Sequence, residues 1–177
     1  MIHADHVNLL KPANLNSGGR WADFGAGAGA FTLALRELVG AQAVIYAVDR
    51  DQRRLAELTH EYQSRFGDSK NLHLLAADFS RTVDLPALDG IVMANSLHFF
   101  KDKEKVLRHA RTFLKPDGFL LVVEYNVDAG NPWVPYPLTF ESFAGLAQQA
   151  GFHAPRLLAR HPSSFLREFY SALTSCK

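Results

Sequence analysis

Hydrophobic residues follow two alternating patterns along the chain. Short continuous apolar runs predict strands buried on both faces of a sheet, and they cover residues 20–24, 43–48, 72–76, 88–94 and 119–124. Apolar residues spaced three or four apart predict helices over 31–38, 50–65 and 101–114. This alternation predicts an α/β fold with an open, mostly parallel sheet that helices cover on both faces.

The two ends of the chain follow different patterns. Residues 5–11 predict a short helix that Pro12 stops, and a polar loop precedes the first strand. After the fifth strand, residues 126–137 contain three prolines and a glycine, which is typical of a long functional loop. A helix over 139–151 and two strands over 156–160 and 165–174 then predict a final hairpin.

Composition favours one compact domain spanning residues 1–177, with residues 1–19 as its short N-terminal segment. A net charge of +1 without long charged runs gives no reason to expect a nucleic acid or an anionic membrane as partner. The lone Cys176 and the lack of a membrane-length apolar run predict a cytoplasmic protein. The histidines show no metal-ligand spacing, so no metal site is expected.

A glycine-rich turn connects the first predicted strand to the first long helix. Gly25, Gly27 and Gly29 allow a sharp turn and leave no side chain where a ligand approaches the backbone. The turn also matches the loose dinucleotide pattern, with Ala30 in the third glycine position, but this pattern alone does not identify the cofactor.

Acidic residues at the ends of three predicted strands narrow the choice of cofactor. Asp23, beside the glycine turn, would repel a pyrophosphate and attract an ammonium group. Asp49 follows the second strand, where a carboxylate can accept hydrogen bonds from both ribose hydroxyls. Asp78 and Phe79 follow the third strand and suit an adenine amine and an adenine ring. Carboxyl ends of parallel strands share one edge, so these groups should lie together.

In its glycine turn and its strand-end acids, the sequence resembles the class I S-adenosylmethionine-dependent methyltransferases of the small type 11 group. The resemblance covers residues 20–174. Five motifs carry the resemblance: Asp23–Gly29, Tyr46–Asp49, Ala77–Phe79, Asp89–His98 and Leu114–Phe119. Ala26 and Ala28 stand where the commonest glycine motif has cysteine or threonine. The resemblance implies a Rossmann-like, doubly wound, seven-stranded sheet, mostly parallel with a C-terminal antiparallel hairpin. It also implies S-adenosylmethionine as cofactor and S-adenosylhomocysteine as product.

The resemblance also indicates which residues form the site. The expected cofactor contacts are Asp23, Gly25, Ala26, Gly27, Asp49, Arg50, Asp78, Phe79, Ala94 and Asn95. The expected acceptor contacts are His98, Asn131, Trp133 and Tyr136. If the acceptor must lose a proton, the candidate bases are His98, Tyr125 and Tyr136.

The expected function is methyl transfer to a small-molecule acceptor. The Asn/Asp-Pro-Pro-aromatic signature of many enzymes that methylate nucleic acid or protein is absent, since Asn95-Ser-Leu-His98 stands there. One alternative is a module that binds S-adenosylmethionine or S-adenosylhomocysteine without turnover. Another is an NAD(P)-dependent reductase, which leaves Asp23 and Asp78 unexplained and lacks a Tyr-x-x-x-Lys pair. The acceptor, the atom methylated and the oligomeric state stay open.

Overall fold

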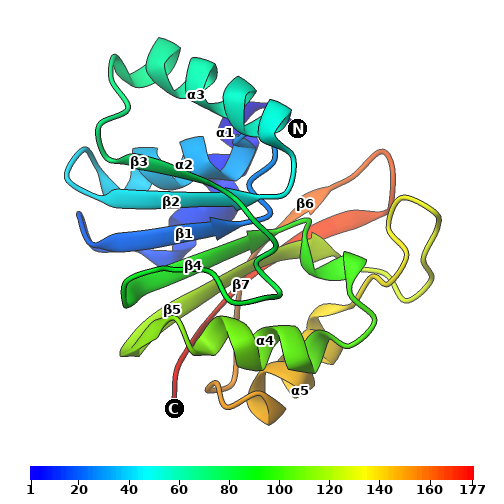
Figure 1. Cartoon of the computed structure of the whole chain (residues 1–177). Coiled ribbons are helices and arrows are strands. Elements are labelled where there is room, and N and C mark those ends of the chain that lie inside the picture. Colours follow the sequence, from blue (N-terminus) through cyan, green and yellow to red (C-terminus); the bar gives the residue numbers. More distant parts are fainter.

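A computed structural model describes all residues, 1–177, and its centre is one sheet of seven strands (Figure 1). The strand order is β3-β2-β1-β4-β5-β7-β6. The strands are β1 Arg20–Phe24, β2 Val44–Asp49, β3 Leu72–Ala76, β4 Leu88–Ala94, β5 Leu114–Tyr125, β6 Arg156–Pro162 and β7 Glu168–Ser175. Strands β1 to β5 pair in parallel, and β7 pairs antiparallel with both β5 and β6. The predicted fold class, including its final antiparallel hairpin, is confirmed.

Five α-helices cover the sheet, three on one face and two on the other (Figure 1). They are α1 His3–Leu10, α2 Ala30–Val39, α3 Gln52–Phe66, α4 Lys103–Arg111 and α5 Phe140–Gln149, and Lys11–Ala13 and Leu97–Phe99 form 3-10 turns. The first three pack on one face, and α4 and α5 pack on the other. The chain passes from β3 to β4 through residues 77–87 without a helix, so strand and helix do not alternate strictly. Each helix is too short or too polar to span a bilayer.

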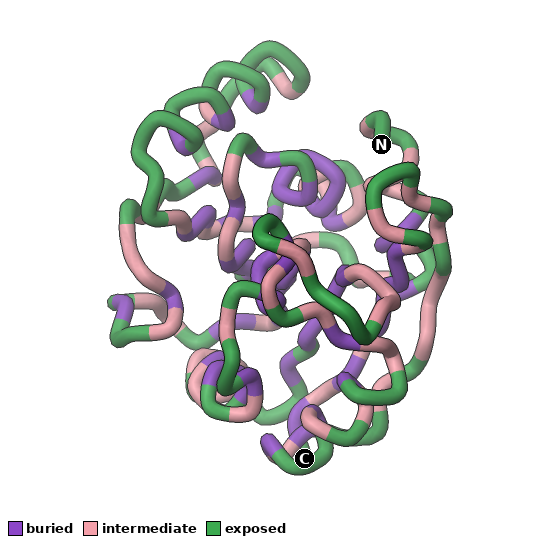
Figure 2. Tube along the Cα trace, turned by 90° about the vertical axis from the view of Figure 1, so that its right-hand side faces the viewer, coloured by how far each residue is buried: buried purple, intermediate pink, exposed green.

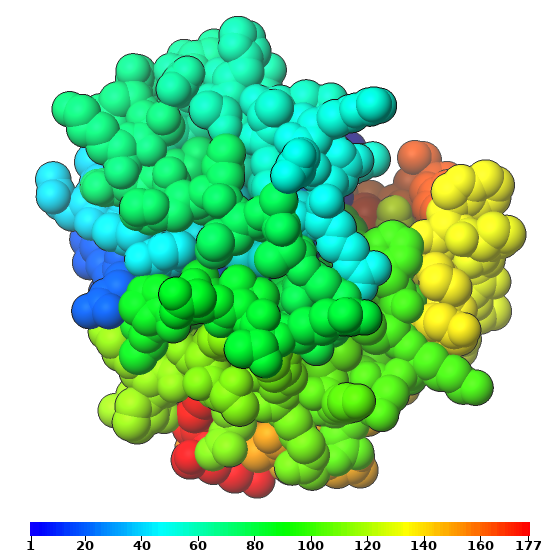
Figure 3. Space-filling model, viewed as in Figure 1, coloured from blue at the N-terminus to red at the C-terminus, as the bar shows by residue number.

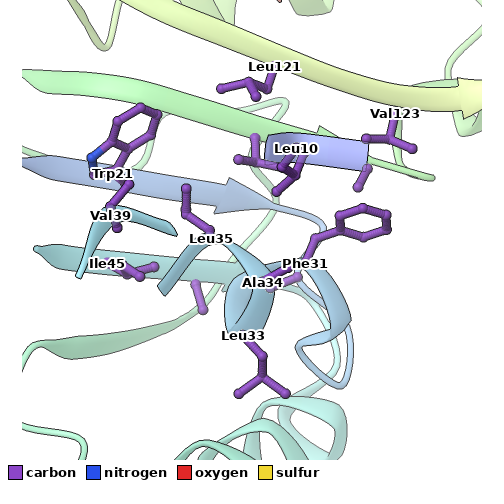
Figure 4. Packing of buried hydrophobic residues seen from close by; sticks show 14 of the residues in the cluster. Leu10, Trp21, Phe31, Leu33, Ala34, Leu35, Val39, Ile45, Leu121 and Val123 are labelled. Atoms are coloured by element: carbon purple, nitrogen blue, oxygen red, sulfur yellow. The ribbon is translucent and has the colours of Figure 1, made fainter. Parts of the chain in front are cut away.

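Each strand of the sheet centre is apolar on both faces because both faces are covered. In β1, Trp21 points into the core beneath α1–α3, whereas Ala22 and Phe24 point toward α4 and α5. Figure 4 shows Leu35 of α2 and Leu10 of α1 packed over the strands on the first face. Both leucines are fully buried, and burial of one such side chain contributes roughly 1.5–3 kcal/mol.

Strand β5 begins earlier than its apolar run predicted. Leu114 already pairs with Leu88, and the register then shifts so that Phe119 pairs with Gly90. Residues 115–118 therefore form a bulge inside the strand, and α4 ends at Arg111 instead of residue 114. The Lys115 ammonium donates to Oδ1 of Asp89 over 2.6 Å and holds the bulge against β4.

The last strand begins later than predicted, at Glu168 instead of residue 165. The Ser163 hydroxyl accepts hydrogen bonds from the backbone N–H groups of Phe165 and Leu166, both over 3.2 Å. This local bonding keeps Phe165 in the turn between β6 and β7. The turn lies beyond the end of β5, because Tyr125 pairs with Phe169 in β7.

Replacement of Gly90 by alanine should destabilise the sheet centre. A Cβ at this position would lie 2.1 Å from the Trp21 ring, so we expect Gly90→Ala to lower the free energy of unfolding by about 1–3 kcal/mol. Gly145→Ala in α5 is the matched control, because no atom lies within 4 Å of that Cβ; it should gain up to about 1 kcal/mol. Urea denaturation followed by circular dichroism measures both. Equal stability of the two variants would contradict the packing of Trp21 on Gly90.

Candidate functional site

The carboxyl ends of β1 to β4 enclose a cleft of about 500 Å³. Its lining comprises Gly25, Gly27, Asp49, Arg50, Asp51, Arg54, Ala77, Asp78, Phe79, Asn95, Ser96, Phe99 and Phe100. Figure 3 shows the surface hollowed between the start of α3, in cyan, and the loop after β5, in yellow. Figure 2 looks onto this edge, where exposed loops frame the buried strand ends. A second cleft, of about 460 Å³, lies at the opposite edge and contains none of the expected site residues.

The glycine turn fits tightly between two neighbouring elements. Gly25 has a φ of +85°, and a Cβ there would lie 2.6 Å from Cβ of Ser96, which follows β4. Gly29 has a φ of +91°, and a Cβ there would lie 2.1 Å from Cδ1 of Leu58 in α3. Only glycine combines these left-handed conformations with such close contacts. The turn therefore presents bare backbone to the cleft.

Asp49 joins the glycine turn to the start of α3. Its carboxylate accepts hydrogen bonds from the backbone N–H of Gly27 over 2.8 Å and of Asp51 over 2.9 Å. Asp51 in turn caps α3, because its carboxylate accepts from the N–H of Arg53 over 2.9 Å. The Asp49 carboxylate also lines the cleft, so its remaining acceptor capacity is available to a ligand.

Asp78 follows β3 on the cleft wall and is paired with the cation of Arg50. Desolvation alone would raise its pKa, but hydrogen bonds from Ser80 and the ion pair with Arg50 lower that pKa below its ordinary value. The Ser80 hydroxyl donates to Oδ1 over 2.6 Å. Phe79, next in the chain, stacks on Phe24 with ring centroids 5.3 Å apart. This wall therefore offers an ionised carboxylate beside a fixed aromatic ring.

Asp23 lies beneath the glycine turn and is 1% exposed, so it is not on the cleft wall. Its pKa is raised to about 7, chiefly because the carboxyl is buried and also because of the nearby charge of Asp49, while hydrogen bonds from Thr32 act in the opposite direction. The Thr32 hydroxyl donates to Oδ2 over 2.6 Å. A cation placed next to this carboxyl would favour its ionised form.

Two polar atoms on the cleft wall have no partner within the chain. The Asn95 side-chain oxygen and the Ser96 hydroxyl are both buried without a hydrogen bond. Asn95 also has a φ of +52°, an uncommon conformation for a residue with a side chain. Buried polar groups are normally satisfied, so these two atoms indicate a polar ligand in the cleft.

His98 and Glu124 form a buried pair beside the cleft. Nδ1 of His98 lies 2.7 Å from the Glu124 carboxylate, which also accepts from the backbone N–H of Leu97 over 2.9 Å and of His98 over 3.1 Å. The carboxylate needs a donor, so we assign the ring proton to Nδ1. Nε2 makes no hydrogen bond within the chain, and the His98 side chain is 3% exposed, so only a small part of the ring is open to solvent.

The loop over 126–137 is fastened to this pair. The backbone N–H of Tyr136 donates to the carbonyl of His98 over 3.0 Å. The Asn131 side-chain oxygen accepts from the N–H groups of Trp133 and Val134, so it shapes the loop. Tyr125 packs on Phe169 with ring centroids 4.2 Å apart.

The structure brings most of the expected cofactor residues together. The cleft wall contains Gly25, Gly27, Asp49, Arg50, Asp78, Phe79 and Asn95, whereas Asp23, Ala26 and Ala94 lie buried behind it. Sequence reasoning missed wall residues that follow the second and fourth strands, namely Asp51, Arg54, Ser96, Phe99 and Phe100. It also missed Glu124, although an acid that ends an apolar strand is the same signal that selected Asp49. No group of three His, Cys, Asp or Glu side chains is arranged to hold a metal ion.

A sheet of this strand order, with a glycine turn and acids at its carboxyl edge, defines the class I methyltransferase fold. A family model described as a methyltransferase domain matches residues 3–173. The chain therefore belongs to this methyltransferase family, and S-adenosylmethionine is the cofactor that membership implies. No curated protein matches the chain.

Solved structures share the fold at low sequence identity. A protein from Nostoc punctiforme described as an O-methyltransferase is 20% identical with a TM-score of 0.78; the match covers 99% of this chain but 57% of that protein. A SAM-dependent methyltransferase from Aquifex aeolicus is 22% identical with a TM-score of 0.75, covering 98% and 90%. YcgJ from Bacillus subtilis is 15% identical with a TM-score of 0.79, covering 99% of both chains. These similarities concern the fold.

The stability contributed by Asp23 should depend on pH. Its pKa is about 7 in the folded protein and 3.8 ordinarily, so between these values the carboxyl ionises in the unfolded chain before it does in the folded one. Folding stability from this group is therefore full below about pH 4 and is lost as the pH rises to 7. We expect Asp23→Asn to match the wild type near pH 4 and to exceed it at pH 8 by on the order of a few kcal/mol.

Urea denaturation of the cofactor-free protein across this pH range measures the difference. Asp84→Asn, at an exposed position, is the control for loss of a carboxylate. A stability difference for Asp23→Asn that is constant from pH 4 to pH 8 would contradict the raised pKa.

Proposed function

We propose that this chain is an S-adenosylmethionine-dependent methyltransferase that acts on a small-molecule acceptor. The observation that carries the proposal is the cleft itself, where the glycine turn, Asp49 and Asp78 meet beside the His98–Glu124 pair. The first three groups suit the cofactor, and the pair suits an acceptor that loses a proton.

The residues of the cleft fit the cofactor by charge and by hydrogen-bonding capacity. When bound, S-adenosylmethionine supplies a methyl group activated by a sulfonium. Asp49 would hold the ribose hydroxyls, and Asp78 with Phe79 would hold the adenine. The unpartnered oxygens of Asn95 and Ser96 would gain partners. Asp23, behind the turn, would favour the positively charged amino-acid end through its electrostatic field.

His98 is the strongest of the three candidate bases. Glu124 holds the imidazole so that Nε2 can accept a proton, and it would stabilise the imidazolium that forms. Burial and the charge of Glu124 raise the pKa of Tyr125, which makes its phenol a poor base at neutral pH. The Tyr136 side chain is exposed, and its contact with His98 is a hydrogen bond from its backbone N–H. Glu124 is therefore a positioning residue for His98.

The fold alone does not establish methyl transfer. The [4+2]-cyclase SpnF has the same fold, with a TM-score of 0.75 and 18% identity over 99% of this chain and 81% of that protein. A module that binds S-adenosylmethionine without turnover would also use the cleft.

Calorimetric titration with S-adenosylmethionine and with NAD, followed by labelled-methyl transfer to an extract of small metabolites, separates these functions. Binding of NAD without binding of S-adenosylmethionine would overturn the proposal, and binding without transfer to any metabolite would favour the module.

Loss of the Asp49 carboxylate should weaken cofactor binding. We expect Asp49→Ala to reduce the affinity for S-adenosylmethionine by about 1–3 kcal/mol, because charge-assisted hydrogen bonds are lost and the glycine turn loses its anchor. Isothermal titration calorimetry measures this, with circular dichroism to verify folding. Glu57→Ala, an exposed acid on α3, is the matched control. Unchanged affinity in Asp49→Ala would remove Asp49 from the binding site.

Loss of the His98 base should reduce turnover without reducing cofactor affinity. We expect His98→Gln to lower kcat by about 10²–10⁴-fold, the usual contribution of general-base catalysis. Glu124→Gln should retain part of the rate, with a changed pH dependence of kcat, because the imidazolium loses its neighbouring charge. Labelled-methyl transfer across pH 6–9 measures both, and His60→Gln, at an exposed position, is the control. A wild-type rate in His98→Gln would show that the acceptor needs no base from this residue.

A further inference from the structure

Exposed aromatic side chains gather beside the proposed base. Five large aromatic side chains of the molecule are exposed, and one of them, Phe119, lies at the opposite edge of the sheet. The other four lie around the end of β4 and the loop after β5; they are Phe99 at 57%, Trp133 at 71%, Tyr136 at 42% and Phe165 at 51% exposed. Apolar groups gathered on a surface next to a cleft indicate a binding surface.

Three of these rings, those of Phe99, Phe165 and Trp133, are connected through His98 and Tyr125 as one row. The ring of Phe99, on the cleft wall, lies 4.3 Å from that of His98, which lies 6.1 Å from Tyr125. Tyr125 lies 6.1 Å from Phe165, and Phe165 lies 6.3 Å from Trp133. We call Phe99, His98, Tyr125, Phe165 and Trp133 the aromatic row. It runs from the cofactor cleft, past the proposed base, to the outer loop.

Separate parts of the chain build the outer end of this row. Phe165 is held in the turn between β6 and β7 by the Ser163 hydroxyl. Trp133 lies in the turn that Asn131 closes. The next residue, Val134, is 3% exposed, so its buried side chain anchors that turn. The backbone is therefore held at both positions, while the rings themselves stay open to solvent. Open aromatic surfaces suit a flat apolar ligand.

The charges near the outer end of the row are only partly paired, because Asp128 and Arg167 are exposed and form no ion pair. Glu168 forms an ion pair with Arg160 and also accepts from the side-chain N–H of Asn126 over 2.7 Å. Within the aromatic row itself, His98 is the one residue whose ring nitrogen can act as a proton acceptor. The row itself contains no Asp, Glu, Lys or Arg side chain, so it is suited to a ring system with one acidic O–H group.

We propose that the methyl acceptor is a flat aromatic compound with a ring hydroxyl, and that it is methylated on that oxygen. This inference rests on the proposed methyl transfer. The acceptor ring packs against Trp133 and Phe165, and its hydroxyl reaches Nε2 of His98. The hydroxyl gives its proton to Nε2, and its oxygen forms a bond to the methyl carbon as the carbon–sulfur bond breaks. The electron pair of that bond goes to sulfur, which leaves a neutral thioether.

A matched pair of probes tests the acceptor class. 2-Naphthol is flat and carries an acidic hydroxyl, whereas decahydro-2-naphthol has the same carbon skeleton and hydroxyl without the aromatic rings. Each is titrated calorimetrically into the protein loaded with S-adenosylhomocysteine. We expect 2-naphthol to bind at least about tenfold more tightly than its saturated analogue. With labelled S-adenosylmethionine, mass spectrometry should identify 2-methoxynaphthalene as the product.

Variants locate the binding surface. Trp133→Ala and Phe165→Ala should each weaken 2-naphthol binding by about fivefold or more while leaving cofactor affinity unchanged. Phe119→Ala removes an exposed ring at the other edge and is the matched control. Equal binding of the two probes, or 2-naphthol binding that survives both substitutions, would overturn the proposal.

The remaining outcomes separate this inference from the proposed function. No binding of S-adenosylmethionine would overturn the proposed function, whatever the probes do. Cofactor binding together with weak, equal binding of both probes would overturn only the acceptor class. Formation of 1-methyl-2-naphthol would overturn methylation at oxygen. Trp133-dependent sedimentation with anionic lipid vesicles, without 2-naphthol binding, would assign the aromatic surface to a membrane and would also overturn the proposal.

Discussion

The close approach of the glycine turn to its neighbours is the constraint on which the site depends. Gly25 lies against Ser96 and Gly29 lies against Leu58, with no space for a side chain at either position. The hydrogen bond from the Gly27 N–H to Asp49 then fixes the turn to the start of α3. These contacts set the distance between β1, the segment after β4 and α3. They therefore set the width of the cleft.

A buried carboxylate organises the other half of the site. Glu124 is fully buried, and a buried charge is tolerated only where donors and a counter-charge satisfy it. Two backbone N–H groups and Nδ1 of His98 donate to it. Lys103 lies nearby, and although burial lowers the pKa of its ammonium, the charge of Glu124 acts in the opposite direction. This network fixes His98, and through the carbonyl of His98 it also fixes the loop at Tyr136.

The two halves of the site differ in chemistry. The cofactor half is rich in charge, with Asp49, Asp78 and Arg50 around the cleft. The acceptor half consists mainly of rings, and the aromatic row contains no Asp, Glu, Lys or Arg. A sulfonium cofactor with two hydroxyls and an amine requires the first environment, whereas a flat hydroxylated ring requires the second. His98 and Phe99 lie at the boundary between them.

Local sequence determined much of this protein, because strand periodicity, glycine turns and strand-end acids are short-range signals. The bounds of β1, β3 and β4 matched the apolar runs, and the class of fold followed from the alternation of elements. Asp49 and Asp78 were found because parallel strands place their carboxyl ends at one edge. In contrast, the bulge in β5 depends on pairing with β4 and on the contact between Lys115 and Asp89.

Only the tertiary structure decided which side chains face the cleft and which face away. Asp23 is beneath the turn because strand β1 alternates its faces and α2 covers that side. Asn131 is occupied by its own loop, and the pairing of Glu124 with His98 joins residues on two different strand ends. The aromatic row draws on four separate segments. Such contacts between distant residues depend on packing, which leaves no local pattern in the sequence.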